Sequence, residues 1–309
     1  MSRAVIYEAF GAPDVLQLKE VAEPHAGPSD VRVRVTAAGL NPMDWLIVSS
    51  PEGAAQFGIN LPAGFGCDFA GVVDEVGAEV EGFAGGDRVY GGAMAQAVAE
   101  FAVVQTGPSA LYRLLHTPEG IEDVVAAALP TPGLTAAAAI ATIAPRAGET
   151  VLIGGAAGGV GVLAVQLARL AGARVLGTSS PSTFDFLREL GVEPVHYGAG
   201  LADRVQAPAP EGVSAAADLF GTETAEAALA LGVSPERICT IAAGPNPPGG
   251  VRATGGADAT VADLARITDA ILAGTLTVPI AASFPIEQVH EAVALQAARH
   301  VHGKIVVTP

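Results

Sequence analysis

The sequence has few basic residues and few cysteines, and it lacks long apolar runs. Lysine and arginine together number 16 against 32 aspartates and glutamates, which gives a formal net charge of -16. Such a charge repels nucleic acid and anionic membrane surfaces, so neither is an expected partner. No uninterrupted apolar stretch is long enough to span a bilayer, and Met1 leads into a strand-like run without a signal-peptide core. We therefore expect a cytoplasmic protein with no membrane partner.

Cysteine is restricted to Cys67 and Cys239, which lie far apart in the sequence. Because a cytoplasmic setting keeps thiols reduced, a structural disulfide is not expected. Apolar residues, in contrast, make up 50% of the 309 residues. That supply is ample for two hydrophobic cores, and two domains are the usual outcome at this length.

A glycine-rich turn is the most informative feature that is present. Residues 154–161 lie between an apolar strand-like run and a helix-like run. Such a turn points backbone N–H groups and the positive end of a helix at an anion, and glycine lets a dinucleotide diphosphate approach closely. The fingerprint positions hold Ala156, Gly158 and Gly161, so the strict pattern is broken and a turn without a ligand is the alternative. We assign the diphosphate to the main chain of Ala157, Gly158, Gly159, Val160 and Gly161.

The surroundings of this turn alternate between strand and helix patterns. Strands are predicted at 149–155, 173–179, 193–197, 216–220 and 237–242, and helices at 159–171, 183–190 and 261–273. This rhythm predicts an α/β fold with a doubly wound parallel sheet, the Rossmann arrangement. Residues 124–274 are the predicted dinucleotide-binding domain.

The segment before the turn has a different texture. Short alternating runs such as 31–35 and 71–77, separated by glycine and proline, indicate an all-β unit. After 277 come one amphipathic helix, 286–299, and a last strand, 303–307, which we expect to return to that unit. Residues 1–123 and 275–309 are the predicted β-rich catalytic domain, with a cleft between the two domains.

Six motifs in order carry a family resemblance: 37–44, 66–73, 86–91, 129–136, the glycine turn and 303–306. With these motifs the whole chain resembles the medium-chain dehydrogenase/reductase superfamily, specifically its zinc-independent quinone oxidoreductase branch. The resemblance implies a β-rich, partly open barrel domain, a nicotinamide-binding Rossmann domain and a homodimer formed across edge strands.

Zinc-dependent relatives hold a metal with cysteine, histidine and a further cysteine or acidic residue. The corresponding positions here fall near Leu40 and at Cys67 with Asp68, an incomplete donor set, since zinc needs three protein ligands. The four-cysteine structural zinc loop is absent as well. We therefore expect no metal site and interpret Cys67 as a core residue. His300 and His302 are expected at the surface.

The end of the second predicted strand bears on the choice of cofactor. NAD enzymes place Asp or Glu there to bind the adenosine ribose, whereas this chain offers the hydroxyls of Ser179 and Ser180. Hydroxyls can bind a 2′-phosphate, so NADP(H) is favoured, and an ordinary turn with a helix cap is the alternative. In the family a tyrosine often follows the next strand, which Tyr197 matches, but the lysine after the second strand is missing.

By resemblance, Asn41, Asp44 and Thr135 line the nicotinamide end and are the candidate catalytic residues. Asn41 could donate to a substrate carbonyl, although Asn41-Pro42 also reads as an ordinary turn; Asp44 is expected to organise the local backbone. Many relatives carry tyrosine or lysine where this chain has Leu46, so no proton donor is expected there. The implied reaction is hydride transfer to a small-molecule quinone or α,β-unsaturated carbonyl.

Further cofactor contacts are predicted at the ends of the later strands, where open α/β sheets bind ligands. The additional predicted cofactor residues are Phe220, Gly221, Ala242, Ala243, Gly244 and Lys304. Lys304 is either close to the cleft or a solvated surface lysine.

Two other functions stay open, an enoyl reductase of a biosynthetic pathway and a non-catalytic NADPH-binding protein resembling some lens crystallins.

Overall fold

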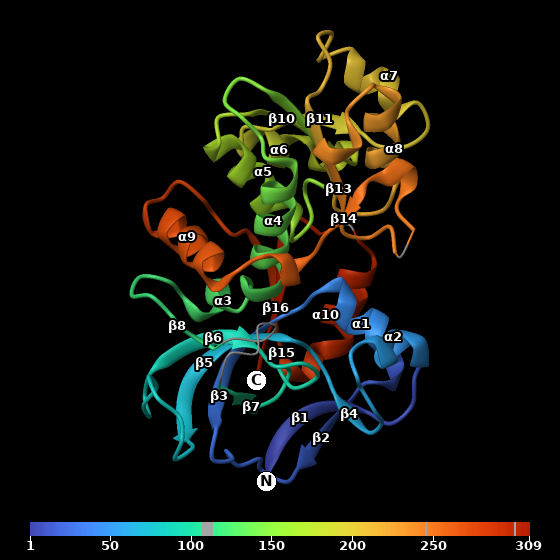
Figure 1. Cartoon of the computed structure of the whole chain (residues 1–309). Helices are drawn as coiled ribbons and strands as arrows, with labels where there is room; N and C mark the ends of the chain where they lie inside the picture. Colours follow the sequence, from blue (N-terminus) through green and yellow to red (C-terminus); the bar gives the residue numbers. More distant parts are fainter. Residues whose placement is uncertain (107–113, 245, 300) are drawn as a thin grey trace. The chain divides into compact units, whose positions relative to one another are not determined.

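The structure is a computed structural model, which describes residues 1–106, 114–244, 246–299 and 301–309. It contains two compact units (Figure 1). Unit 1 is Met1–Thr131 with Ile280–Pro309, and unit 2 is Pro132–Pro279. The junctions thus lie at 131/132 and 279/280, while the domain limits expected from the sequence, 123/124 and 274/275, stay a prediction.

Unit 1 is built on two mostly antiparallel sheets. The larger has the order β15-β16-β3-β5-β6-β8, with β7 also paired to β3, and the smaller has the order β2-β1-β4. Only β15 and β16 pair in parallel among these strands as the structure describes them. The bounds are β1 (Ser2–Tyr7), β2 (Gln17–Val21), β3 (Asp30–Gly39), β4 (Ala63–Gly64), β5 (Asp68–Val76), β6 (Arg88–Gly92), β7 (Phe101–Gln105), β8 (Leu115–His116), β15 (Ile280–Pro285) and β16 (Lys304–Thr308).

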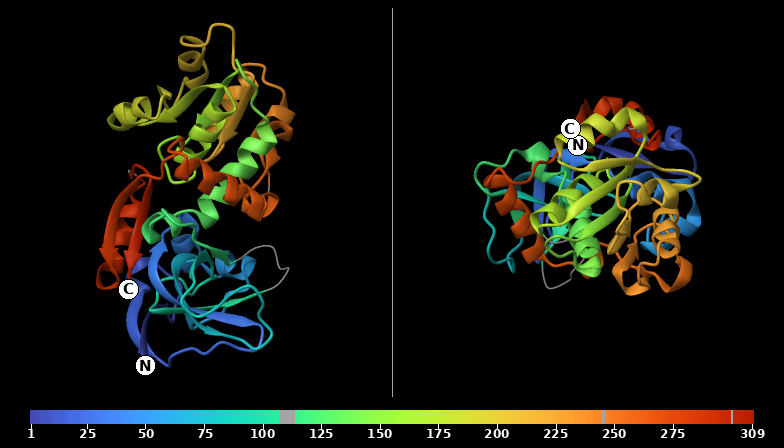
Figure 2. Two further views of the ribbon diagram at one scale, coloured as in Figure 1. Left: turned by 90° about the vertical axis from the view of Figure 1, so that its left-hand side faces the viewer. Right: turned by 90° about the horizontal axis from the view of Figure 1, so that it is seen from above.

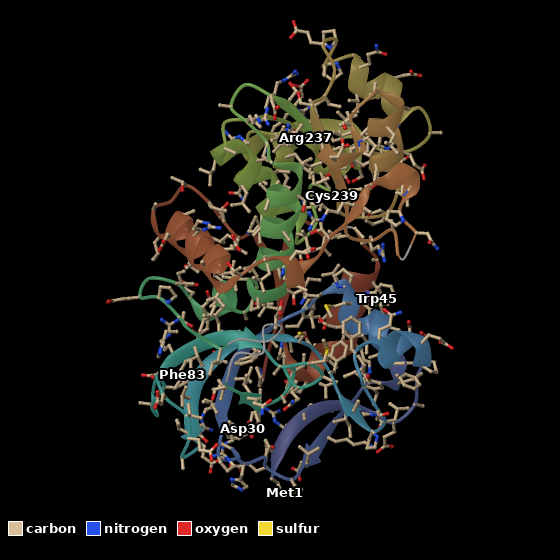
Figure 3. The ribbon with its side chains drawn as sticks, viewed as in Figure 1. Met1, Asp30, Trp45, Phe83, Arg237 and Cys239 are labelled. Carbon is tan, nitrogen blue, oxygen red and sulfur yellow. The ribbon has the colours of Figure 1, made fainter. Side chains whose placement is uncertain are left out.

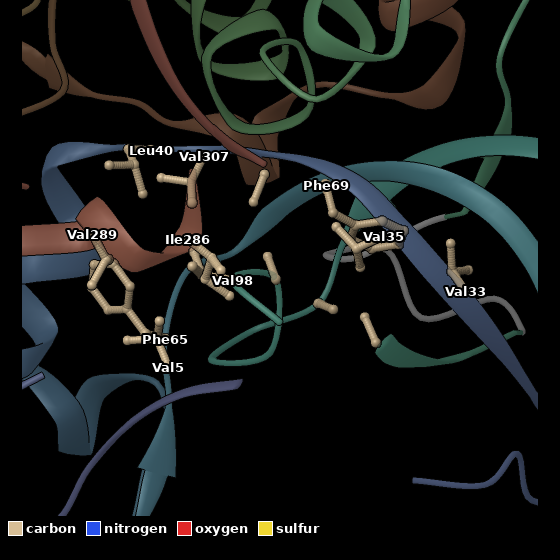
Figure 4. Packing of buried hydrophobic residues seen from close by; sticks show 14 of the residues in the cluster. Val5, Val33, Val35, Leu40, Phe65, Phe69, Val98, Ile286, Val289 and Val307 are labelled. Carbon is tan, nitrogen blue, oxygen red and sulfur yellow. The ribbon is translucent and has the colours of Figure 1, made fainter. Parts of the chain in front are cut away.

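The core of unit 1 follows from the two-residue period of its strands. Val31, Val33 and Val35 of β3 are buried, whereas Arg34 points outward. Ile286 and Val307 from the C-terminal segment pack into the same cluster (Figure 4). The C-terminal residues therefore complete a core that the N-terminal strands begin.

The segment before the glycine turn is not all β, and that part of the sequence interpretation is wrong, because it contains α1 (Pro42–Ser49), α2 (Pro51–Gln56) and α3 (Asp123–Ala126). The helix predicted at 286–299 is present in unit 1 as α10 (Val289–Ala297). Helix α1 has too few turns for a helical period to stand out in the sequence. Its residue Trp45 is half-buried, and the indole N–H donates to Gln296 at 2.6 Å (Figure 3). The available signal was local: Pro42 in the first turn and the pair Asn41 and Asp44 as a capping box.

Unit 2 contains a six-stranded parallel sheet of order β11-β10-β9-β12-β13-β14. The predicted doubly wound Rossmann sheet is confirmed. The strands are β9 (Thr150–Gly154), β10 (Arg174–Ser179), β11 (Glu193–His196), β12 (Ala215–Asp218), β13 (Ile238–Thr240) and β14 (Arg252–Ala253). The helices are α4 (Pro130–Ile143), whose first two residues belong to unit 1, α5 (Gly161–Leu170), α6 (Phe184–Glu189), α7 (Leu201–Gln206), α8 (Glu223–Ala230) and α9 (Val261–Leu272).

The central strands of this sheet are buried on both faces. Val151, Leu152 and Ile153 of β9 are each 0% exposed, as expected for a parallel sheet that helices cover. Helix α5 packs against β9 and β10, and α8 packs against β12 and β13 (Figures 1 and 2). The chain leaves β9 for β10 on one side and later returns to β12 on the other, so β9 and β12 flank the topological switch point.

No helix within the described ranges has both the length and the apolar character needed to cross a membrane. Short 3₁₀ turns lie at Pro13–Val15, Pro181–Thr183, Pro235–Arg237, Pro248–Gly250, Gly256–Asp258 and Ile286–Gln288.

Candidate functional site

The glycine turn connects β9 to α5 in unit 2, and several of its glycines are required by packing. A Cβ on Gly154 would lie 2.3 Å from the Thr224 hydroxyl oxygen, and one on Gly161 would lie 2.1 Å from the Gly155 carbonyl oxygen. Gly155 has a φ of 66°, in the left-handed region that favours glycine. The fold of unit 2 by itself therefore requires these three residues to be glycine.

Gly158 is different, because the fold does not require glycine there. A Cβ at this position would meet the Gly155 carbonyl oxygen at 3.4 Å, an ordinary contact, and its φ lies outside the left-handed region. Gly158 is half-buried, and Val160, the N-cap residue of α5, makes no side-chain cap hydrogen bond. The Gly158 N–H donates within the turn to the Gly155 carbonyl at 3.0 Å. The turn thus combines a helix N-terminus that no side chain caps with main chain that carries few side-chain atoms, the combination that suits a diphosphate.

Ala156 takes the first fingerprint position without disturbing the turn. Its N–H donates to the Thr178 carbonyl at 3.1 Å, and the side chain is 0% exposed. A Cβ built on Gly177 of the neighbouring strand β10 would lie 2.8 Å from the Ala156 Cβ. Gly177 therefore provides the room that alanine needs, which explains why the broken sequence pattern still gives the turn.

The residues predicted to bind a 2′-phosphate follow adjacent strands. Ser179 pairs with His196 across β10 and β11, so Ser180 and Tyr197 come next at the same edge of the sheet. Ser179 is buried, the Ser180 and Ser182 hydroxyls share a hydrogen bond of 2.8 Å, and Tyr197 is 45% exposed. Residues 179–183 include no carboxylate.

Arg204 is a cation at this edge that the sequence interpretation missed. Its guanidinium donates to the carbonyls of His196 at 2.8 Å, Tyr197 at 3.1 Å and Ala199 at 2.8 Å. It therefore holds the loop that follows β11 and brings a positive charge close to Tyr197. Arg204 is remote in sequence from the position directly after β10 where the family's lysine is expected, because its place depends on the path of this loop.

Two buried polar residues fix the loops after β12 and β13. The Asp218 carboxylate accepts from the backbone N–H groups of Phe220 at 3.1 Å, Gly221 at 2.8 Å and Thr224 at 2.8 Å. The Thr240 hydroxyl donates to the Gly221 carbonyl at 3.1 Å.

The predicted backbone positions are thus held by side chains that the sequence interpretation did not consider. Thr240 also accepts from Ala242 N at 3.3 Å and Ala243 N at 3.2 Å, while Gly244 has a φ of 67°. A polar residue at the last position of a buried strand was the signal that could have indicated both Asp218 and Thr240. Cys239, which precedes Thr240, is buried (Figure 3), and burial raises the pKa of its thiol to about 12.

In unit 1 the structure brings Asn41, Asp44 and Lys304 together. The Asn41 backbone N–H donates to the Asp44 carboxylate at 2.7 Å, which fixes the turn in front of α1. The Asn41 carboxamide donates to Asp68 at 2.8 Å and accepts from the Lys304 ammonium at 2.6 Å. Lys304 also donates to the Leu40 carbonyl at 2.7 Å and is 3% exposed, so the alternative of a solvated surface lysine is wrong.

Asp68 is the member of this cluster that was considered only as a zinc position. It is 0% exposed and accepts from the hydroxyl of Thr131 at 2.7 Å and from its backbone N–H at 3.1 Å. A charged residue inside the apolar run 66–73 was the signal for a buried role. We call Asn41, Asp44, Asp68 and Lys304 the buried cluster from here on.

The buried cluster contains two carboxyl groups and one ammonium. Burial raises the pKa of Asp44 to about 7, and the charge of Asp68 adds to the rise. The hydrogen bond from the Asn41 N–H and the ammonium of Lys304 lower this pKa and so offset part of the rise. Burial also raises the pKa of Asp68 and lowers the pKa of Lys304, and the attraction between these two opposes both shifts. One carboxyl group therefore titrates near neutral pH.

The remaining predicted catalytic residue, Thr135, belongs to unit 2. It is 8% exposed on α4, one helical turn after Thr131, so the two threonines lie on the same side of that helix. Thr131, in unit 1, is bonded to the buried cluster through Asp68.

The donor set of the buried cluster does not fit zinc. The Asp68 carboxylate is already bonded to Asn41 and Thr131, and the Lys304 ammonium supplies a positive charge. Among the described residues, no group of three or more His, Cys, Asp or Glu side chains could hold a metal ion. His300, expected at the surface with His302, lies outside the described residues.

Two family models match the chain. The alcohol dehydrogenase GroES-like domain matches residues 27–151, and the zinc-binding dehydrogenase domain matches residues 190–307. The chain belongs to the medium-chain dehydrogenase/reductase superfamily. The glycine turn of this superfamily member lies between the two matched segments.

Curated relatives include quinone oxidoreductases. One from Pseudomonas aeruginosa is 38% identical over 201 residues, which are 64% of this chain and 59% of that protein. The matched part thus spans little more than half of that relative. A spectinabilin polyketide synthase system protein from Streptomyces orinoci is 42% identical over 192 residues, 61% of this chain and 8% of that protein.

Solved structures of the superfamily align over the full chain. The quinone oxidoreductase from Coxiella burnetii has a TM-score of 0.84 at 28% identity and covers 100% of this chain and 99% of its own. A mycobacterial protein complexed with NADPH has a TM-score of 0.85 at 27% identity, covering 100% of both chains. The CurK enoyl reductase has a TM-score of 0.83 at 26% identity and covers 99% of both.

Proposed function

We propose that this protein is an NADPH-dependent, zinc-independent oxidoreductase that transfers hydride to a quinone or an α,β-unsaturated carbonyl compound. The observation that carries the proposal is the turn at the switch point of the parallel sheet, where Gly158 is a glycine that the fold does not require. The quinone oxidoreductases among its relatives support the reaction class. The mycobacterial NADPH complex supports the cofactor.

The residues present fit a nicotinamide dinucleotide. The main chain of residues 157–161 would hold the diphosphate at the open N-terminus of α5, and the loops that Asp218 and Thr240 fix would flank the nicotinamide ribose. The bound cofactor would supply the hydride. The protein's contribution is to bind and orient it, because hydride transfer requires little acid or base chemistry from side chains.

The preference for NADPH rests on the edge formed by β10 and β11. Ser179, Ser180 and Tyr197 offer hydroxyls, Arg204 adds positive charge to the neighbouring loop, and no carboxylate is present at 179–183 to repel a 2′-phosphate. Ser180→Asp should therefore weaken NADPH binding at least tenfold, as expected for a like charge placed beside the phosphate, and leave NADH binding within about twofold. Calorimetric titration of both reduced cofactors measures this, with Ser180→Asn as the control that has a similar shape and no charge.

At the acceptor end, Asn41 and Thr135 would orient the substrate, and Asp44 would hold the turn in front of α1. Leu46 is 45% exposed and has no proton to give. We therefore propose that water or the cofactor hydroxyls complete the protonation of the reduced acceptor.

An enoyl reductase is the second candidate, favoured by the similarity to the CurK enoyl reductase and to the Streptomyces orinoci polyketide synthase protein.

We also propose a homodimer in which β14 is the contacting strand, because it is an edge strand whose two residues are exposed. Analytical ultracentrifugation of the wild-type chain and an Ala253→Pro variant would test the dimer.

The deciding experiment compares NADPH oxidation with simple quinones and with enoyl thioesters, using the purified full chain. Faster turnover of quinones supports the proposal, whereas faster turnover of enoyl thioesters supports the second candidate. Tight NADPH binding without turnover across both sets would indicate a non-catalytic, crystallin-like binding protein. Calorimetry that detects no binding of either reduced cofactor would contradict all three.

A further inference from the structure

The Asn41 carboxamide has an orientation that its neighbours dictate. Its oxygen faces the Lys304 ammonium, which can only donate, and its nitrogen faces the Asp68 carboxylate, which accepts. In a flipped amide the nitrogen would face the Lys304 ammonium, so that two donors meet, and the oxygen would face the Asp68 carboxylate, so that two acceptors meet. The contacts themselves therefore settle which atom is nitrogen and which is oxygen.

One Asn41 amide hydrogen is left with little to bind. The first donates to Asp68 at 2.8 Å, while the second has the Gly39 carbonyl at 3.5 Å, the outer limit of a hydrogen bond. An acceptor carbonyl oxygen would make a better partner for that second hydrogen. Only the present orientation offers such a hydrogen, because the flipped amide would present its oxygen to the carbonyl instead.

We propose that Lys304 is the positioning residue of the acceptor site, and that its ammonium holds the Asn41 carboxamide with the N–H side available to a carbonyl oxygen. This inference rests on the proposed function, because it assumes that Asn41 meets the acceptor. Lys304 lies on β16, Asn41 precedes α1 and Asp68 begins β5, so the orientation depends on three segments that only the fold brings together.

Removal of the ammonium would free the amide in two ways. The Asn41 oxygen would lose its donor, and Asp68 would lose the nearby charge that favours its ionised form. A protonated Asp68 can donate to the amide oxygen as readily as it accepts from the amide nitrogen. The two orientations would then be similar in energy, and an amide that turns between them would no longer hold a carbonyl oxygen in a fixed position.

The chain offers a matched control, because Lys19 and Lys304 are its only two lysines. Lys19 pairs with Glu8 at 2.8 Å and its side chain is 33% exposed. Lys304→Met should lower kcat/KM for a quinone by up to about 10²-fold, as expected for a misplaced substrate contact. Lys304→Arg should recover part of the loss, Lys19→Met should match the wild type, and NADPH affinity should stay within twofold in all variants, since the glycine turn belongs to unit 2.

A second measurement does not depend on turnover. Lysine labelled with ¹³C and ¹⁵N gives two side-chain ammonium signals, which Lys19→Met assigns. We expect the Lys304 signal to lie away from the position of exposed lysines and to move in Asn41→Ala, while the Lys19 signal stays in place. A Lys304 signal that is unaffected by Asn41→Ala would overturn the proposal whatever the activity is.

Poor folding of Lys304→Met would not hide the answer. The double variant Lys304→Met/Asp68→Asn removes the ammonium together with one of the two carboxyl groups and should recover part of the thermal stability, but turnover should stay low if amide orientation is what matters. Turnover that recovers together with stability, or wild-type turnover in Lys304→Met, would overturn the proposal. Absence of turnover in the wild type would instead contradict the proposed function and leave the spectroscopic test to decide the contact.

Discussion

The glycine turn of unit 2 and the buried cluster of unit 1 show two ways to build a site. The turn is made of consecutive residues, and the groups proposed to bind the diphosphate are main-chain groups, so its chemistry can be read along the sequence. The cluster collects side chains from residues 41–44, 68, 131 and 304, and its chemistry depends on burial. A local site is therefore visible as a motif, whereas an assembled site is visible only once the fold is known.

The largest effect is expected where the assembled site loses its only ammonium. In Lys304→Met, two buried carboxyl groups lose their cation, and removal of one partner from a buried ion pair typically costs about 3–5 kcal/mol. Lys19→Met should change the free energy of unfolding by less than about 1 kcal/mol, as surface pairs do. Urea denaturation of both variants measures the difference. Equal stabilities would mean that the buried cluster is not held by its charges.

Two glycines of the turn should separate folding from binding. Gly161→Ala forces a Cβ against the Gly155 carbonyl oxygen and should cost about 1–3 kcal/mol of stability through overpacking. Gly158→Ala should leave stability unchanged or raise it by about 0.4–1 kcal/mol, because the unfolded chain becomes less flexible. The same variant should weaken NADPH binding at least tenfold, since its Cβ occupies the approach to the main chain.

Calorimetry and thermal unfolding of the two glycine variants give both quantities. Tight NADPH binding in Gly158→Ala would remove the main support for the diphosphate site.

The buried cluster should also make stability depend on pH. The pKa of Asp44 is raised in the folded protein to about 7 from 3.8, so between these values the folded state holds more protons than the unfolded state. Its contribution is fully present below about pH 4 and is lost as the pH rises through 7, at up to about 1.4 kcal/mol per pH unit. Asp44→Asn should flatten this decline. Unfolding curves of the wild type and Asp44→Asn at pH 5 and pH 8 measure the change in the free energy of unfolding between these two pH values. An equal change in the two proteins would contradict the raised pKa.

The smallest effect concerns Tyr7, which lines a cavity together with Asp44. The Tyr7 hydroxyl is buried and has no hydrogen-bond partner among the described residues. Tyr7→Phe should therefore be neutral or stabilising by at most about 1 kcal/mol, since it removes an unsatisfied polar group. A clear loss of stability in thermal unfolding would show that the hydroxyl binds a water in that cavity.

The sequence predicted unit 2 better than unit 1. The strand and helix pattern of unit 2 was legible because its central strands are short, mostly apolar runs bounded by turns, as in 150–153. Helix α1 was missed because it is short, and Asp68 was missed because its partners come from residues 41 and 131. The substrate role of Asn41, the role of Thr135 and the 2′-phosphate site stay predictions.

The sequence alone determined the parallel sheet, the turn after β9 and the superfamily, because hydrophobic period and glycine spacing are local properties of a chain. Only the tertiary structure decided that Lys304 is buried, that Asp68 belongs to the buried cluster and that Gly158, unlike Gly161, is free of packing demands. The physical reason is that burial and close approach are properties of pairs of segments. A single segment carries no record of which distant residue will exclude water from it.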